Sequence, residues 1–219
     1  MILSALKLSV IVVSIATAVI AVLGTAFGYL LAKRNFHGRE ILDAILTLPM
    51  VLPPTVTGYY LILLLGRRGL IGQPVYSLTG WSVTFTLAAA VIASAVIALP
   101  IMIRSARAAI ESLDPQYEIA SFTLGKSELQ TLFRVILPLA GRGIWAGIIL
   151  SFARAFGEFG ATLMLAGNIP GRTQTMPLAI YEAVVSGEDN EAKWLALILT
   201  GISVAVVYAT NRLTRPRTN

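Results

Sequence analysis

Long runs of apolar residues are the feature that most constrains the fold of this chain. Several of these runs reach the roughly 20 residues that a helix needs to cross the hydrocarbon core of a membrane. Charged residues make up only 13% of the chain, whereas a soluble domain carries roughly a quarter. The sequence therefore predicts an all-α, polytopic membrane protein with about five transmembrane helices. The apolar segments are about Ile2–Ala32, Ile41–Leu65, Val83–Ile103, Leu139–Leu165 and Trp194–Asn211.

The distribution of lysine and arginine between the loops predicts the orientation. Basic residues of membrane proteins collect on cytoplasmic loops, and this preference accounts for the formal net charge of +6 without a nucleic-acid partner. We expect the N-terminus outside, the C-terminus in the cytoplasm, a large cytoplasmic loop at Arg104–Arg142, and external segments at Gly66–Ser82 and Ala166–Lys193. The basic residues assigned to the cytoplasm are Lys33, Arg34, Arg39, Arg104, Arg107, Lys126, Arg134, Arg142, Arg212, Arg215 and Arg217, and those outside are Lys7, Arg67, Arg68, Arg172 and Lys193.

Prolines interrupt the second apolar segment at "LPMVLPPTVTGYY". A proline removes a backbone donor and clashes with the preceding turn, and in lipid the freed carbonyls need partners from neighbours, hydroxyls or water. The segment is therefore expected to be broken, either as a plain structural kink or, as we favour, beside a transport pathway. The candidate pathway residues here are Pro53, Pro54, Thr55, Thr57 and Gly58.

The fourth segment carries two charged residues within "SFARAFGEFGATLML". Arg154 and Glu158 lie four residues apart, so we expect them to share one face of a helix. A charge at the bilayer centre costs about 3 kcal/mol or more, so both side chains should face protein or water. They form either an internal ion pair or a pair bordering the pathway, and Gly160 belongs to a small-residue surface suited to close helix packing.

The stretch Gly125-Lys126-Ser127 has the ending of a nucleotide-binding P-loop. The first glycine of that motif is missing, because Ala120 occupies its position. The stretch also lies between membrane segments, without the strand–loop–helix geometry that forms a phosphate nest. We therefore expect this chain to bind no ATP. It has no cysteine, which excludes disulfides and thiolate metal sites.

The same region predicts a short helix after Asp114, a turn at Gly125, a second helix and a return to the membrane at Pro138. It resembles the coupling loop of ABC-importer permeases: Glu-Ala-Ala, three residues, Gly, nine residues, an aliphatic residue, any residue, Leu-Pro. Ile119 departs from this pattern, which has Ala there. The residues at the positions of this pattern, together with the apolar neighbours Phe122 and Leu124, are Glu118, Ile119, Ala120, Gly125, Val135, Leu137 and Pro138.

The stretches "GRRGLIG" and "GEFGATLMLAGNIPGRTQT" resemble the molybdate branch of the oxyanion-importer permeases. The resemblance implies a type I ABC importer permease, one transmembrane domain over residues 1–219, with a cytoplasmic coupling loop at about 104–138 and an external loop at about 166–193. It also implies a multi-pass inner-membrane homodimer in the lipid bilayer, served by two ABC ATPase subunits and an extracytoplasmic substrate-binding protein. ATP and magnesium would be bound by the ATPase, and this chain would hold no cofactor and no metal.

Two alternatives remain open from the sequence. Tungstate and sulfate permeases are similar to the molybdate branch, and substrate competition separates the three. A channel or secondary transporter would instead use Arg154 and Glu158 as ion-coupling groups and would need no ATPase. We see no inverted repeat of the kind that supports a secondary transporter, and an enzyme is disfavoured because no nucleophile or metal-ligand cluster stands out.

Overall fold

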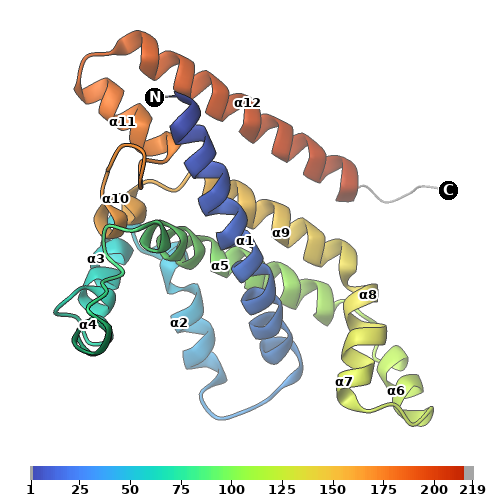
Figure 1. Cartoon of the computed structure of the whole chain (residues 1–219). Coiled ribbons are helices and arrows are strands. Elements are labelled where there is room, and N and C mark those ends of the chain that lie inside the picture. Colours follow the sequence, from blue (N-terminus) through green and yellow to red (C-terminus); the bar gives the residue numbers. More distant parts are fainter. Residues whose placement is uncertain (1, 215–219) are drawn as a thin grey trace.

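The computed structural model describes residues 2–214, and this part of the chain consists of helices and their connections, with no strand (Figure 1). Arg215 and Arg217, which the charge pattern assigned to the cytoplasm, lie outside the described residues. The helical elements are α1 (Ile2–Lys33), α2 (Arg39–Val51), α3 (Pro54–Leu65), α4 (Gly72–Thr79), α5 (Leu87–Glu111), α6 (Gln116–Thr123), α7 (Glu128–Thr131), a π-helical turn (Leu132–Ile136), α8 (Leu137–Leu139), α9 (Gly141–Phe156), α10 (Gly160–Ala166), α11 (Met176–Val185) and α12 (Asp189–Thr214).

Three helices, α1, α5 and α12, are long and apolar enough to cross a membrane by themselves. The helices α1 and α5 pack together along the centre of the molecule, and α9 lies against both. Small residues allow this close approach: a side chain at Gly28 would meet the Cβ atom of Ala106 at 2.7 Å. The main apolar core is built here, with buried Ile20 and Met102 among its larger members.

The second and fourth apolar segments are both broken. Leu52 and Pro53 separate α2 from α3, as the prolines predict. The fourth segment divides into α9 and α10 with residues 157–159 between them, and before α9 the chain bends by 72° from the helical stretch Glu128–Leu139. The expectation of one continuous helix through Arg154 and Glu158 is therefore wrong, because α9 ends at Phe156.

Three boundaries differ from the sequence-based expectation. Helix α5 continues to Glu111, so Arg104 and Arg107 lie in its last two turns rather than in a loop. Helix α4 lies within the segment Gly66–Ser82, where no helix was predicted. Helix α11 likewise lies within the predicted external segment Ala166–Lys193, where it begins at Met176 and buries one face in the core.

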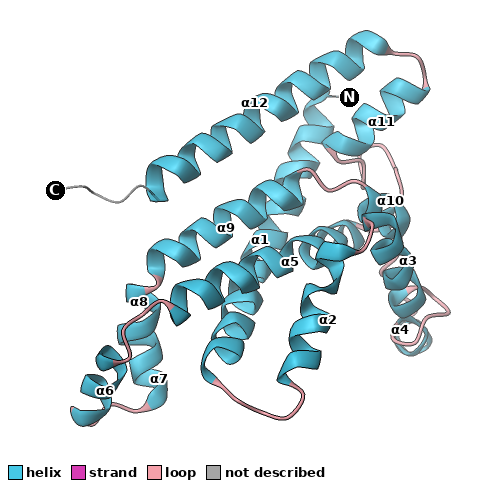
Figure 2. Cartoon of the chain, turned by 180° about the vertical axis from the view of Figure 1, so that it is seen from behind, coloured by secondary structure: helices cyan, strands magenta, loops and turns pink. Residues whose placement is uncertain are grey.

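The connections gather at two opposite ends of the molecule. Figure 1 shows α4, α10, α11 and the start of α1 towards one side, and α6, α7, α8 and the end of α12 towards the other. Figure 2, from behind, shows the same division. The α6–α8 segment and the α10–α11 region therefore lie apart in space, whereas the α1–α2 connection lies at the lower edge of the view in Figure 1.

Candidate functional site

The breaks of the second and fourth segments lie against each other. A Cβ atom built on Gly58 would come within 2.8 Å of the Cα atom of Ala161, and one built on Gly160 would come within 3.1 Å of Thr55 and Pro54. The start of α3 therefore packs backbone-to-backbone on the start of α10. The structure brings together candidate pathway residues that lie about 100 positions apart in the chain.

The predicted pair of charges forms, although the helix ends between its members. Arg154 Nη1 donates to Glu158 Oε2 at 2.9 Å, and the N–H of Ala161 donates to Glu158 Oε1 at 2.9 Å. The Glu158 side chain is only 1% exposed, whereas that of Arg154 is 34% exposed. Glu158 therefore caps the start of α10 and is held by a cation that still reaches the surface. The two charges therefore form an ion pair, as both interpretations of the sequence require.

The remaining pathway candidates divide into an exposed and a buried group. Pro53 and Thr55 are exposed at the start of α3, whereas Thr57 is buried. The hydroxyls of Thr57 and Thr162 are buried without a hydrogen-bond partner among the described residues. Two unpartnered hydroxyls beside a broken helix pair are unusual, because buried polar groups are normally satisfied.

The segment from α6 to α8 has the helix–turn–helix form that its sequence predicts. Asp114 Oδ1 accepts the N–H of Gln116 at 2.9 Å and starts α6. Gly125 has a φ of 74°, in the left-handed region that favours glycine, and the N–H of Lys126 returns to the carbonyl of Ser121 at 3.1 Å. These bonds close the helix in the manner of a glycine C-cap. A capping box between Ser127 and Gln130 then begins α7.

The surroundings of Gly125-Lys126-Ser127 differ from those of a nucleotide-binding P-loop. Helix α6 (Gln116–Thr123) occupies the positions where a P-loop would have the end of a strand and the start of the glycine-rich loop. Among the described residues, no group of three or more His, Cys, Asp or Glu side chains lies together in a way that could hold a metal ion.

Several large apolar side chains of the α6–α8 segment are exposed. Ile119, Phe122 and Leu124 are 62%, 48% and 78% exposed, and Ala120 is exposed beside them. Leu129 and Phe133 extend this surface along the following helix. Large apolar side chains gathered in this way mark an interaction surface. We call these residues the exposed apolar set of α6–α8: Ile119, Ala120, Phe122, Leu124, Leu129 and Phe133.

The inner face of the same segment is fastened to the end of α1. Glu118 forms an ion pair with Lys33, and Arg34 Nη2 lies 2.5 Å from Glu128 Oε1. The Tyr29 hydroxyl donates to the same Glu128 oxygen at 3.2 Å. Sequence reasoning missed Tyr29, Lys33, Arg34 and Glu128, because no local pattern predicts contacts across 85 to 99 residues.

Within the segment itself, a buried hydrogen bond links the two helices. The hydroxyls of Ser121 and Thr131 lie 2.8 Å apart. Such a satisfied buried contact fixes α6 relative to α7. The segment and the last turn of α1 are thus held together by several polar contacts.

Leu137 and Pro138 lie where the chain returns towards the core. A π-helical turn precedes them, and the N–H of Leu137 reaches back to the carbonyl of Leu132. Proline lacks the N–H that a regular α-helix needs there, and the wider turn accommodates it. Ile136 and Ala140 pack with Ile110 on either side of Pro138, which anchors the segment to the end of α5.

Comparison with known proteins adds a family and a set of relatives. The sequence model of the family described as "Binding-protein-dependent transport system inner membrane component" matches residues 24–219. The chain is 40% identical over 217 residues to the molybdenum transport system permease protein ModB of Escherichia coli, covering 97% of this chain and 95% of that protein. It is 42% identical over 180 residues to ModB of Haemophilus influenzae, covering 80% and 79%.

Solved structures share the fold at low sequence identity. An inward-facing structure of the MetNI methionine ABC transporter has a TM-score of 0.71 at 16% identity, covering 100% of this chain and 94% of that one. An amino acid ABC transporter structure has a TM-score of 0.66 at 18% identity, covering 98% and 92%. These similarities establish the fold, and the predicted all-α architecture of an ABC importer permease is confirmed.

Proposed function

Because this chain belongs to the family of binding-protein-dependent transport system inner membrane components, we propose that it is the permease subunit of an ABC importer for molybdate. The observation that carries the proposal is the 40% identity to a molybdenum transport permease over nearly the whole length of both chains. The chain is a transport subunit of the inner membrane, which it enters with several apolar helices. ATP and magnesium act on a separate ATPase in this proposal.

The exposed apolar set of α6–α8 is the proposed docking surface for that ATPase. Its large side chains have no cover within the described part of the chain, and an ATPase groove would bury them. One such surface per chain fits a transporter with two permease chains and two ATPase subunits. The residues we propose for coupling are Glu118, Ile119, Ala120, Phe122, Leu124, Gly125, Leu137 and Pro138.

Glu118 has a different role within this set. Its carboxylate pairs with Lys33 of the same chain, so it orients α6 rather than filling a partner groove. Glu128 orients α7 in the same way, through its ion pair with Arg34. When the ATPases close, a displacement of α6 is therefore carried to α1 as well as to α9, because polar contacts and the continuing helix connect them.

The proposed pathway runs past the paired breaks of α2/α3 and α9/α10. Pro53, Thr55 and the exposed part of Arg154 border it in this proposal, while Pro54, Thr57, Gly58, Glu158 and Gly160 shape the helix contact behind it. Glu158 neutralises the positive charge of Arg154. A weakly charged lining suits a pathway that must release a dianion instead of trapping it. An extracytoplasmic binding protein delivers the anion and sets most of the specificity.

The proposed orientation places the N-terminus outside and the C-terminus in the cytoplasm. The basic connections near Lys33, Arg39 and Lys126 then face the cytoplasm. The coupling loop at about 104–138 and the external loop at about 166–193 lie at opposite ends of the molecule (Figure 1), which supports this assignment. All of it belongs to one transmembrane domain in this proposal.

Uptake of radiolabelled molybdate by cells lacking this chain tests the substrate, with tungstate and sulfate as competitors. We expect uptake to fall in these cells and to return when the chain is supplied. Tungstate should compete and sulfate should not. If molybdate uptake is unchanged while sulfate uptake falls, the chain is a permease for a different oxyanion.

A further inference from the structure

Helix α2 buries none of its side chains within this chain. Its apolar residues Ile41, Ile45, Met50 and Val51 are all at least 60% exposed. The contacts of α2 with the rest of the described molecule are mainly with α5. The apolar residues Leu42, Leu46 and Pro49 of α2 are only half-buried, so apolar packing fixes this helix less firmly than it fixes α1 against α5.

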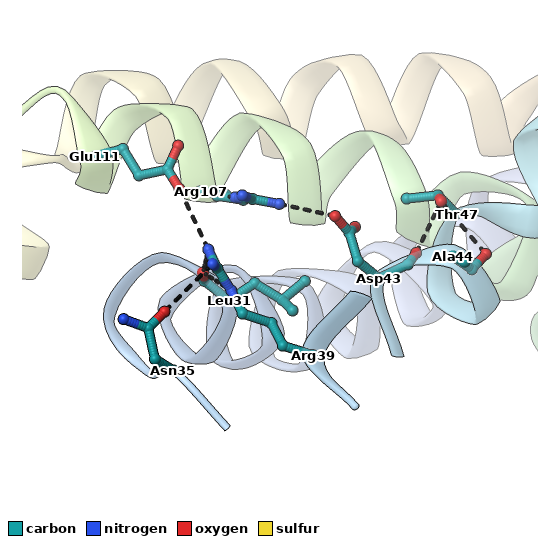
Figure 3. A network of polar contacts seen from close by, with 8 residues as sticks. All are labelled: Leu31, Asn35, Arg39, Asp43, Ala44, Thr47, Arg107 and Glu111. Carbon is teal, nitrogen blue, oxygen red and sulfur yellow. Dashed lines mark hydrogen bonds and ion pairs between the residues drawn. The ribbon is translucent and has the colours of Figure 1, made fainter. Parts of the chain in front are cut away.

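Charged side chains hold the first half of α2 in place (Figure 3). Arg107 of α5 donates through Nη1 to Asp43 Oδ2 at 2.8 Å and through Nε to Glu111 Oε1 at 2.8 Å. Arg39, one turn before Asp43, lies 3.9 Å from Glu111. Its Nε donates to the carbonyl of Leu31 at 3.0 Å, one of the last carbonyls of α1 and without a partner from the helix itself.

The other half of α2 has no such attachment. Thr47 donates only to carbonyls of its own helix, and beyond it the described chain has no ion pair or side-chain hydrogen bond until the break at Leu52. The four charged groups are 29% to 44% exposed. Partly hydrated ion pairs of this kind contribute little net free energy, so they can break and re-form where a packed apolar interface would not.

We propose that Arg107 is a positioning residue that holds α2 against α5, and that its ion pair with Asp43 opens and closes during the transport cycle. The proposal rests on the proposed importer function. The exposed apolar part of α2 then moves about an attachment at Arg39, next to the end of α1. The end of α1 also carries the ion pair of Lys33 to Glu118 of α6 and is followed by the ion pair of Arg34 to Glu128 of α7. Movement of the ATPase would therefore reach α2 through the end of α1.

Crosslinking in the assembled transporter tests the opening directly. The chain has no native cysteine, so a variant with Thr47→Cys and Arg104→Cys, about one turn away from Asp43 and Arg107 on α2 and α5 and with the ion pair left in place, can be treated with a reversible bis-thiosulfonate. We expect the crosslink yield to differ by about fivefold between the nucleotide-free and the vanadate-trapped complex, the factor that corresponds to an ion pair of about 1 kcal/mol. The matched control carries Ser121→Cys and Thr131→Cys, whose native hydroxyls lie 2.8 Å apart within one segment, and its yield should be the same in both states.

Neutral substitutions test the positioning role. Arg107→Gln should raise the ATP hydrolysed per molybdate transported by up to about fivefold, the factor that corresponds to an ion pair of about 1 kcal/mol. Arg107→Lys should restore most of the coupling. Arg104→Gln is the control, because Arg104 lies on the same helix, is exposed, and makes no ion pair or hydrogen bond among the described residues.

A parallel pair of variants covers the case in which Arg107→Gln fails to fold. Asp43→Asn should uncouple in the same way, whereas Glu40→Gln on the same helix should not, since Glu40 is exposed and unpaired within the described chain. Equal crosslink yields in both nucleotide states, or equal coupling in the test and control variants, would overturn the proposal. The crosslink yields can be measured without any substrate. A native transporter that takes up no molybdate would therefore contradict the proposed function and not the role of Arg107.

Discussion

Substitution of Glu158 gives the most quantitative test of the site. The Glu158 carboxylate accepts one hydrogen bond from Arg154 and one from the N–H of Ala161, and its side chain is almost fully buried. Loss of a helix cap costs about 0.5–2 kcal/mol, and breaking a fully buried ion pair costs about 3–5 kcal/mol. Because Arg154 is a third exposed, water screens it after the loss, which reduces the second figure.

We therefore expect Glu158→Ala to lower the free energy of unfolding by about 3 kcal/mol. Glu158→Gln keeps an acceptor for the Ala161 N–H but replaces the oxygen that accepts from Arg154 with an NH2 donor. Because water can accept from the partly exposed Arg154, this variant should lower that free energy by about 1 kcal/mol. With about 2–4 °C of melting temperature per kcal/mol for a chain of this size, the two variants should melt about 6–12 °C and about 2–4 °C below the native chain.

Thermal unfolding of the detergent-purified complex, with Glu188→Ala as an exposed control, measures these shifts. Arg154→Ala should also damage folding or transport, because it leaves a buried carboxylate without its cation. If Glu158→Gln melts as low as Glu158→Ala, the cap at Ala161 is not what Glu158 contributes. If Arg154→Ala and both Glu158 variants behave like the native chain, the argument from paired charges is wrong.

Three further predictions concern backbone geometry and topology. Gly58→Ala should destabilise the chain by about 1–3 kcal/mol through overpacking at the α3–α10 contact, whereas Gly201→Ala, with open space around it, should not lower the melting temperature. The Gly125→Asp variant should insert normally in the membrane, yet its ATP hydrolysis should be uncoupled from uptake. Normal uptake by this variant would contradict the proposed coupling role of the turn at Gly125. In single-cysteine chains, a membrane-impermeant maleimide added outside should label Arg172→Cys and spare Lys126→Cys, and the reverse result would invert the proposed orientation.

The parts of the fold that the sequence predicts are those with local causes. The break at Pro53 follows from the missing N–H of proline, and the end of α6 follows from glycine at a left-handed φ. The start of α6 follows from the Asp114 side chain, which accepts the next free amide. Each of these features depends on a few neighbouring residues, and each is present where it was expected.

The parts that the sequence does not predict depend on distant residues. Helix α9 stops at Phe156, and the start of α10 then packs at Gly160 against Thr55 of α3, about 100 positions away in the chain. The ion pair of Glu118 with Lys33 joins residues 85 positions apart. A motif match alone assigns Glu118 to a partner, and only the tertiary arrangement directs its carboxylate to α1. For the same reason, the attachment of α2 through Arg107 has no signature in the spacing of its residues.

ATP-driven accumulation is the most direct test of the account. The permease, assembled with its ATPase and binding protein in proteoliposomes, would be supplied with labelled molybdate on the side of the binding protein and ATP on the other. We predict accumulation against a gradient that requires ATP hydrolysis and is lost with Gly125→Asp. Equal uptake without ATP, stopping at equilibrium or following an ion gradient, would contradict the account and would identify a channel or a secondary transporter.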